Sequence, residues 1–110
     1  MSSTPGFSLQ VTVYLNPDDV PKFLEHIKPA YDAVVAEPEC QFFEVYQLQE
    51  EPGTLHWVED WNATTDWFMK EQITKPYYKD YLAATESMFV KPREFKIYNR
   101  LGSSFYTAKQ

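Results

Sequence analysis

Every tryptophan of the chain lies in one short stretch, LHWVEDWNATTDW (residues 55–67), together with several acidic side chains. Trp57, Glu59 and Trp61 follow one another at two-residue steps, so in a β-strand all three side chains lie on the same face. A carboxylate between two indoles loses its hydration, which raises its pKa toward the range of a general base at neutral pH. The same carboxylate could instead form a buried ion pair with a lysine or arginine of another element, and both interpretations stay open.

Four further polar side chains are candidates for ligand contacts or proton transfer. Asn99 is the polar residue on an otherwise apolar strand face; a buried amide without a partner costs about 1–3 kcal/mol, so Asn99 is a candidate for orienting a ligand. Tyr77 and Tyr81 lie one helical turn apart and either hydrogen-bond a substrate oxygen or belong to the core. His56 titrates in a useful range, but strand parity points it away from Trp57, and we expect a structural histidine.

Composition excludes several classes of function. The chain has 110 residues, 16 acidic against 10 basic, and this net charge of −6 disfavours nucleic acids and anionic membranes as partners. Two distant histidines and the single Cys40 predict no metal site and no intramolecular disulfide. Three glycines give no phosphate-binding loop, and no membrane-spanning run or signal-peptide pattern is visible, so we expect a cytoplasmic protein.

The apolar periodicity predicts the order strand, helix, strand, strand, helix, strand. Residues 7–15 alternate with period two, and a helix follows Asn16 and Pro17, which suit a helix start. The predicted elements are residues 7–15, 20–37 (with Pro29 inside the helix), 40–49, 54–62, 64–90 (broken near TKPYY) and 93–101.

This order predicts a single α+β domain over residues 1–110, with a ferredoxin-like βαββαβ arrangement and a four-stranded antiparallel sheet. Two helices cover one face of such a sheet. Residues 40–49 are apolar on both faces, so we expect a second copy of the chain to bury the other face in a homodimer. Phe105 and Tyr106 in the tail are candidates for docking on the neighbouring subunit.

Four motifs in order resemble the antibiotic biosynthesis monooxygenase domain, a branch of the dimeric α+β barrel superfamily. They are EPEC at residues 37–40, the aromatic Phe43, WVEDW at residues 57–61 and KPYYKDYL at residues 75–82. The match runs from about residue 9 to residue 101. The chain departs from the usual pattern at five positions: Glu39 replaces a glycine, Phe43 a tyrosine, Lys75 and Tyr77 the serine and histidine of S-P-H-F, and Gln72 a further histidine.

The resemblance implies a cofactor-independent monooxygenase that acts with O₂ on a hydrophobic aromatic molecule, such as a polyketide-like phenol or a quinol. It implies that Trp61, at the family's E-x-W position, lines the pocket. Strand parity places Trp57 on the same face and Trp67 begins the helix above it, so the three indoles either form an aromatic wall for a flat substrate or fill the core. The predicted catalytic residues are therefore Trp61, Glu59 and Tyr77; the predicted substrate-binding residues are Trp57, Trp67, Tyr81, Asn99 and Phe43.

Two other functions fit the same fold. A polyketide cyclase or isomerase would need an acid–base pair, such as a tyrosine with His56, and no oxygen. A non-catalytic dimeric binder of small molecules would be consistent with the missing family histidines. Haem-degrading relatives need an axial histidine on the second helix, and residues 63–90 contain none, so haem is not expected.

Overall fold

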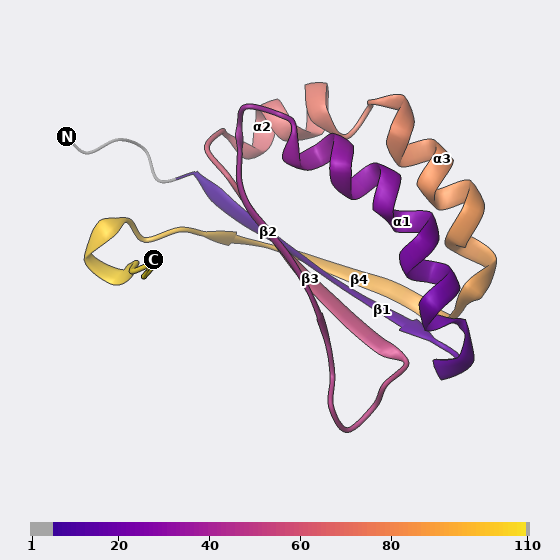
Figure 1. Ribbon diagram of the computed structural model, residues 1–110. Helices are drawn as coiled ribbons and strands as arrows, with labels where there is room; N and C mark the ends of the chain where they lie inside the picture. The colour runs from indigo at the N-terminus through magenta and orange to yellow at the C-terminus, as the bar shows by residue number, and fades with distance from the viewer. Residues whose placement is uncertain (1–5, 110) are drawn as a thin grey trace.

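The alternating segment at the start of the chain lies in the middle of an antiparallel sheet in the computed structural model, which describes residues 6–109. The sheet has the strand order β2-β3-β1-β4, and the helical segments cover one of its faces (Figure 1). The strands are β1 (Phe7–Leu15), β2 (Cys40–Gln47), β3 (Thr54–Trp61) and β4 (Phe89–Asn99). The predicted βαββαβ fold is therefore confirmed; residues 1–5 and 110 of the predicted domain lie outside the described residues.

The first helical segment begins where the sequence predicts it. The Asn16 side chain accepts a hydrogen bond from the backbone N–H of Asp18 and caps a 3₁₀ turn, Pro17–Asp19. Helix α1 (Val20–Val35) follows and continues through Pro29, which lacks only one backbone donor. Among residues 6–109, no helix is both long and apolar enough to cross a membrane.

The second helical segment is interrupted close to the predicted position. Helix α2 (Thr65–Trp67) is capped by the Thr64 hydroxyl and continues as a π-helical turn, Phe68–Gln72. After a break, helix α3 (Pro76–Thr85) starts with a proline at its first position, where the missing N–H costs no helical bond. π-Helical turns often occur at functional sites, and this turn fully buries Gln72.

The last strand starts earlier than predicted. The helical stripe predicts helix up to Val90 and strand from residue 93, but β4 begins at Phe89, which pairs with Leu15 of β1. Pro92 is tolerated because β4 is an edge strand and its register with β1 is irregular in this region. The strand ends at Asn99, two residues before the predicted end.

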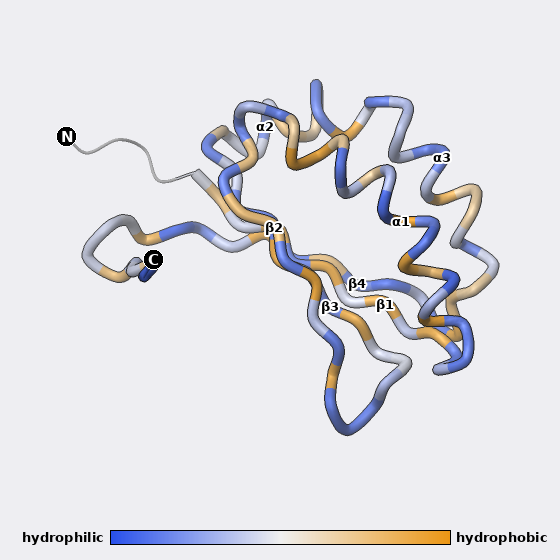
Figure 2. The backbone as a smooth tube through the Cα atoms, in the orientation of Figure 1, coloured by the Kyte–Doolittle hydropathy of each residue, from blue (hydrophilic) through white to orange (hydrophobic). Residues whose placement is uncertain are grey.

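The core lies between the helices and the inner face of β1 and β3. Hydrophobic residues recur at every second position along β1 (Figure 2). The side chains at these positions, Phe7, Leu9, Val11, Val13 and Leu15, are all buried. Phe23 of α1 is fully buried at the centre, and its ring centroid lies 6.2 Å from those of Trp57, Tyr81 and Phe89. These contacts join helices α1 and α3 to strands β3 and β4 at one point.

The open face of the sheet is less apolar than the sequence suggests. Phe42 and Tyr46 of β2 are exposed there. The centre of this face is polar, because His56 contacts the Thr12 hydroxyl through Nδ1 (2.8 Å) and the Gln10 amide oxygen through Nε2 (3.2 Å). His56 is thus a hydrogen-bonded structural histidine on the face opposite Trp57.

We predict that Phe23→Ala lowers the free energy of unfolding by about 3–5 kcal/mol, because it removes a fully buried ring from the centre of the core. Leu24→Ala is the matched control on the same helix, since Leu24 is 40% exposed, and should cost about 1 kcal/mol or less. Urea unfolding of both variants measures the difference. Equal losses would contradict the placement of Phe23 at the core centre.

Candidate functional site

The inner face of β3 holds a buried carboxylate between two indoles. The strand alternates strictly in burial, and Glu59 is only 4% exposed. Each carboxylate oxygen accepts one indole N–H: Trp57 Nε1 lies 3.0 Å from Oε2, and Trp61 Nε1 lies 3.0 Å from Oε1. The two-residue spacing therefore directs both indole N–H groups at the carboxylate between them. We call this arrangement of Trp57, Glu59 and Trp61 the clamp.

The electrostatics of Glu59 suit proton transfer near neutral pH. Burial raises the pKa of this carboxyl to about 7, and the two indole hydrogen bonds oppose the rise. The ion pairs within residues 6–109 are Lys28–Asp32 and Lys75–Glu37, so no lysine or arginine of this part of the chain neutralises Glu59. The carboxyl can therefore exist in either protonation state at physiological pH.

A small cavity of about 30 Å³ adjoins Glu59 between the helices and the sheet. That volume suits a water molecule and is too small for an aromatic ring. Tyr78 and Tyr81 of α3 also line it, and the buried Tyr81 hydroxyl has no hydrogen-bond partner among residues 6–109. Burial raises the pKa of Tyr81 to about 12, so this hydroxyl stays protonated. The remaining lining residues are Ile27, Ala30, Tyr31, Val34, Phe43 and Trp57.

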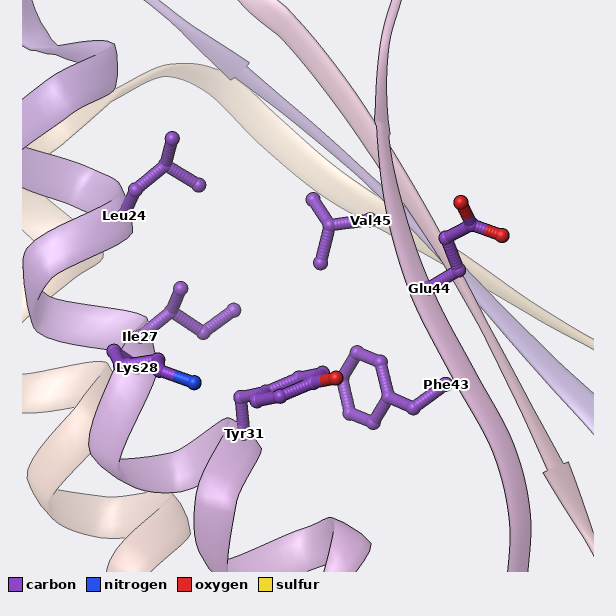
Figure 3. A pocket seen from close by; sticks show the side chains of 7 residues that line it. All are labelled: Leu24, Ile27, Lys28, Tyr31, Phe43, Glu44 and Val45. Carbon is purple, nitrogen blue, oxygen red and sulfur yellow. The ribbon is translucent and has the colours of Figure 1, made fainter.

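A larger groove of about 340 Å³ lies outside this cavity, between α1 and β2. Figure 3 shows Leu24, Ile27, Lys28 and Tyr31 of α1 facing Phe43 and Val45 of β2, with Glu44 turned away from the groove. A volume of this size falls within the range of small-molecule sites.

Two aromatic rings separate the groove from the cavity. Tyr31 and Phe43 line both spaces, and their rings meet edge to face at a centroid distance of 4.8 Å. Lys28 lies over the outer side of the Tyr31 ring, 4.7 Å from its centroid, and is itself paired with Asp32. Ile27 also lines both spaces, so these three side chains lie between the groove and the cavity beside Glu59.

A second hydrogen-bond network ties the start of α3 to the segment after α1. Glu37 Oε2 accepts a hydrogen bond from Lys75 Nζ (2.7 Å) and one from the Tyr77 hydroxyl (2.8 Å). The buried Gln72 amide nitrogen donates to the hydroxyls of Tyr77 (2.6 Å) and Tyr78 (2.9 Å). The hydrogen bond from Lys75 holds the pKa of Glu37 below its usual value, and burial raises that of Tyr77 to about 12.

The structure brings together some of the predicted site residues. Glu59, Trp57, Tyr81 and Phe43 line one cavity. Tyr77 lies beside it, with its hydroxyl engaged by Glu37 and Gln72.

The other predicted residues lie outside the cavity lining. Trp61 is fully buried behind Glu59, its ring centroid 5.3 Å from that of Phe68 and 6.1 Å from that of the partly buried Trp67. Asn99 pairs with Phe7 at the end of β4 and is exposed, so the desolvation argument for it is wrong. Trp61 therefore contacts Glu59 through its N–H and does not line the cavity beside Glu59.

Sequence reasoning missed three residues of the site: Tyr31, Gln72 and Tyr78. Tyr31 continues the apolar stripe of α1 four residues after Ile27, a signal that is also typical of a core residue. Gln72 was noted only as the replacement of a family histidine. Among residues 6–109, no three His, Cys, Asp or Glu side chains come together as a metal site would require.

Comparisons with known proteins agree with this architecture. "Putative monooxygenase GME11364" of Pestalotiopsis microspora is 38% identical over 98 residues, which cover 89% of this chain and 82% of that protein. The solved structure of an antibiotic biosynthesis monooxygenase superposes with a TM-score of 0.76 at 10% identity, covering 87% of this chain and 99% of the other. A conserved protein from Methanosarcina mazei gives a TM-score of 0.76 at 21% identity, with 86% and 91% covered. No family model matches the chain.

The raised pKa of Glu59 predicts a pH-dependent stability. The folded state keeps its proton up to about pH 7, whereas the unfolded chain releases it near pH 4.5. The retained proton of Glu59 therefore stabilises the folded state fully below pH 4.5. This stabilisation is lost as the pH rises from 4.5 through 7. Between pH 5 and pH 8 the wild type should lose about 2–3 kcal/mol of unfolding free energy relative to Glu59→Gln.

Chemical unfolding of both proteins at the two pH values measures this loss. The substitution also disturbs the indole hydrogen bonds, but that cost does not vary with pH and cancels in the comparison. Parallel pH profiles for the two proteins would show that the Glu59 pKa is not raised.

Proposed function

Because this chain belongs to the antibiotic biosynthesis monooxygenase-like family, we propose that it is a cofactor-independent monooxygenase of a flat aromatic molecule that carries an acidic hydroxyl group. The observation that carries this proposal is the buried carboxyl of Glu59, with a pKa of about 7, beside a cavity that adjoins an apolar groove. A base of this pKa is half ionised at neutral pH, which suits general base catalysis.

The proposed reaction begins with proton transfer. Glu59 accepts the proton of the substrate hydroxyl, and the resulting anion is electron-rich enough to reduce O₂ in a site that excludes water. A carbon–oxygen bond forms at an activated ring carbon that carries hydrogen, and the peroxide takes back the proton held by Glu59 to give a hydroperoxide. Loss of water from it leaves one oxygen atom in the product as a carbonyl and releases the other as water. The substrate supplies all the electrons, so no further reductant is required.

Binding is proposed to open the aromatic contact at the mouth of the cavity. The substrate ring slides between Tyr31 and Phe43 and reaches the edge of Trp57, while the groove between α1 and β2 holds the rest of the molecule. An edge-to-face aromatic pair contributes about 0.5–1.5 kcal/mol, so its separation is readily offset by stacking on the ligand. The position of Phe43 in both linings supports its predicted role in substrate binding.

The predicted catalytic roles of Trp61 and Tyr77 are proposed in a more specific form. Trp61 donates its indole N–H to Glu59 and tunes the basicity of the carboxylate without touching the cavity. Tyr77 keeps its proton and belongs to the network around Glu37 and Gln72. In this proposal, Trp61 affects catalysis through Glu59, and Tyr77 affects it through Glu37 and Gln72.

A cofactor-free cyclase or isomerase is a second candidate, favoured by one observation. Tyr81 and Glu59 line the same cavity and offer an acid and a base to one substrate. A pair of a tyrosine with His56 is not assembled, because His56 lies on the opposite face of the sheet. Oxygen dependence separates the two functions.

We also propose that the protein works as a homodimer through the open face of the sheet. Phe42 and Tyr46 of β2 expose aromatic surface on that face, and Phe105 of the tail is 84% exposed. Burial of such side chains by a second copy would remove apolar surface from water.

We predict oxygen uptake when the metal-stripped protein meets a suitable anthrone, hydroquinone or flavonoid-like phenol, measured with an oxygen electrode and by mass analysis of the product. Glu59→Gln should bind the same compound but lose about 10²–10⁴-fold in turnover, because it removes the general base. Glu44→Gln is the matched control, since Glu44 is exposed and turned away from the groove. It should retain wild-type turnover.

The outcomes of this experiment are distinct. A rearranged product without oxygen uptake would show that the protein is a cyclase or isomerase and not a monooxygenase. Binding of the compound without formation of any product would indicate a non-catalytic small-molecule binder. Unchanged turnover in Glu59→Gln would remove Glu59 from the mechanism.

Trp61→Phe should shift the pH dependence of turnover. The variant keeps an aromatic ring but removes one of the two N–H donors that lower the pKa of Glu59, so this pKa rises above about 7. The rising limb of the pH–rate profile should move upward by about one pH unit. Trp67→Phe is the control, because Trp67 packs on Trp61 and donates no hydrogen bond to Glu59. Identical profiles for the two variants would contradict the clamp.

A further inference from the structure

The carboxyl of Glu59 is buried, so its proton needs a route to and from solvent. A group with a pKa of about 7 changes its protonation state with every excursion of the pH around neutrality. On the groove side, the side chains of Ile27, Tyr31 and Phe43 lie between the cavity and solvent. The other side of the cavity, toward the start of α3, carries a series of hydrogen-bonded hydroxyl groups instead.

These hydrogen bonds run from the cavity to the surface. Tyr78 lines the cavity beside Glu59, and its hydroxyl donates a hydrogen bond to the Tyr77 oxygen. The centroids of the two tyrosine rings lie 4.7 Å apart. The Tyr77 hydroxyl in turn donates to Glu37 Oε2 at 2.8 Å. The Glu37 side chain is 18% exposed, so the series ends at solvent. We call Tyr78, Tyr77 and Glu37 the relay.

Gln72 holds the two tyrosine oxygens of the relay in place. Its amide nitrogen donates to the oxygen of Tyr77 (2.6 Å) and to that of Tyr78 (2.9 Å). A phenol oxygen can accept a second hydrogen bond. Tyr77 uses this capacity for the hydroxyl of Tyr78, and Tyr78 keeps it for a donor in the cavity. All O–H groups of the relay therefore point in one direction, away from Glu59.

The cavity can hold the link between Glu59 and the relay. Its volume of about 30 Å³ fits one water molecule, which needs about two to four polar partners when buried. Glu59, Tyr78 and Tyr81 provide three partners in the lining. A water there would also satisfy the Tyr81 hydroxyl, which has no hydrogen-bond partner among residues 6–109. Tyr81 thus offers no onward hydrogen bond, whereas Tyr78 does.

We propose that the relay is the path by which Glu59 exchanges its proton with solvent. On release, Glu59 gives its proton to the cavity water, and the water gives one of its own to Tyr78. Tyr78 passes its hydroxyl proton to Tyr77, which passes its own to Glu37, and Glu37 releases it to bulk water. Each oxygen of the two tyrosines gains one proton as it loses another, so both remain neutral. Rotation of the hydroxyl groups then restores the starting directions.

The acidities along the relay support this order of events. The hydrogen bond from Lys75 holds the pKa of Glu37 below its usual value, so a proton that reaches Glu37 is soon lost to water. Burial raises the pKa of Tyr77 to about 12, so no tyrosinate accumulates and the protons move together. The use of the relay in turnover rests on the proposed role of Glu59 as base. The exchange itself needs no substrate.

Carbon-13 NMR of the Glu59 side-chain carboxyl measures this exchange in the protein alone. The signal moves when the group ionises, and its loss in Glu59→Gln assigns it. Relaxation dispersion near pH 7 gives the exchange rate on the microsecond-to-millisecond scale. We predict that Tyr77→Phe and Glu37→Gln each slow the exchange by about tenfold or more, because the proton must then wait for a local opening of the fold. The midpoint of the titration should stay near pH 7, since neither residue contacts Glu59.

Two matched variants separate the relay from other routes. Glu44→Gln removes an exposed carboxylate, and Tyr31→Phe removes a hydroxyl from the groove side of the same cavity. Both should keep the wild-type exchange rate. Slower exchange in Tyr31→Phe, with an unchanged rate in Tyr77→Phe, would place the route through the groove and overturn the proposal. Equal slowing in all four variants would also overturn it, because the rate would then depend on packing.

Mixtures of H₂O and D₂O test the wild type without any substitution. Because several protons move together, the exchange rate should fall along a curved line as the deuterium fraction rises. A straight line would mean that a single proton is transferred, and would overturn the relay. Slowed exchange in Tyr77→Phe and Glu37→Gln, in a protein that consumes no oxygen with any substrate, would support the relay and remove only the monooxygenase proposal.

Discussion

Glu59 remains inside the domain because Trp57 and Trp61 each donate an N–H to one of its oxygens. A buried carboxylate without partners costs several kcal/mol, and hydrogen bonds to a charged acceptor contribute about 1.5–3 kcal/mol each. The two effects nearly balance, so neither protonation state is strongly preferred near pH 7. An arginine beside the carboxylate would instead have kept it ionised.

The clamp depends on the regularity of β3 and on its central position. β3 pairs with β1 and with β2, so its backbone is held on both sides and its alternate side chains cannot change face. Phe23 fixes Trp57 from the helix side, and Phe68 supports Trp61. The core therefore does two tasks: it stabilises the domain and it orients the two donors.

Sequence patterns predicted the features that depend on a single strand. They failed for features that depend on contacts between segments far apart in the chain. The two-residue spacing of Trp57, Glu59 and Trp61 was sufficient to place them on one face and to anticipate a raised pKa. The Tyr31–Phe43 contact joins a helix to a strand, and no spacing within either reveals it. Asn99 lies on the predicted face, yet it is exposed at the strand end.

The start of β4 and the position of Tyr78 in the cavity lining escaped prediction for related reasons. The apolar stripe around Phe89 continues the helical pattern of α3, and only pairing with Leu15 converts it into a strand. Tyr78 accepts a hydrogen bond from Gln72, whose burial depends on the π-helical turn before α3. Such turns have no clear sequence signal, so the direction of a hydrogen bond could not be read from residue types.

β2, which carries one wall of the groove, is an edge strand and pairs only with β3. Its partner across the groove is the outer side of α1, where Leu24 and Lys28 do not belong to the buried core. Substitutions on these two surfaces change the shape of the entrance but leave the pairing of β3 with β1 intact. In the proposed function, the residues that select the substrate are thus separate from the carboxylate that accepts the proton, so the entrance can change its shape without a change in the strand that carries Glu59.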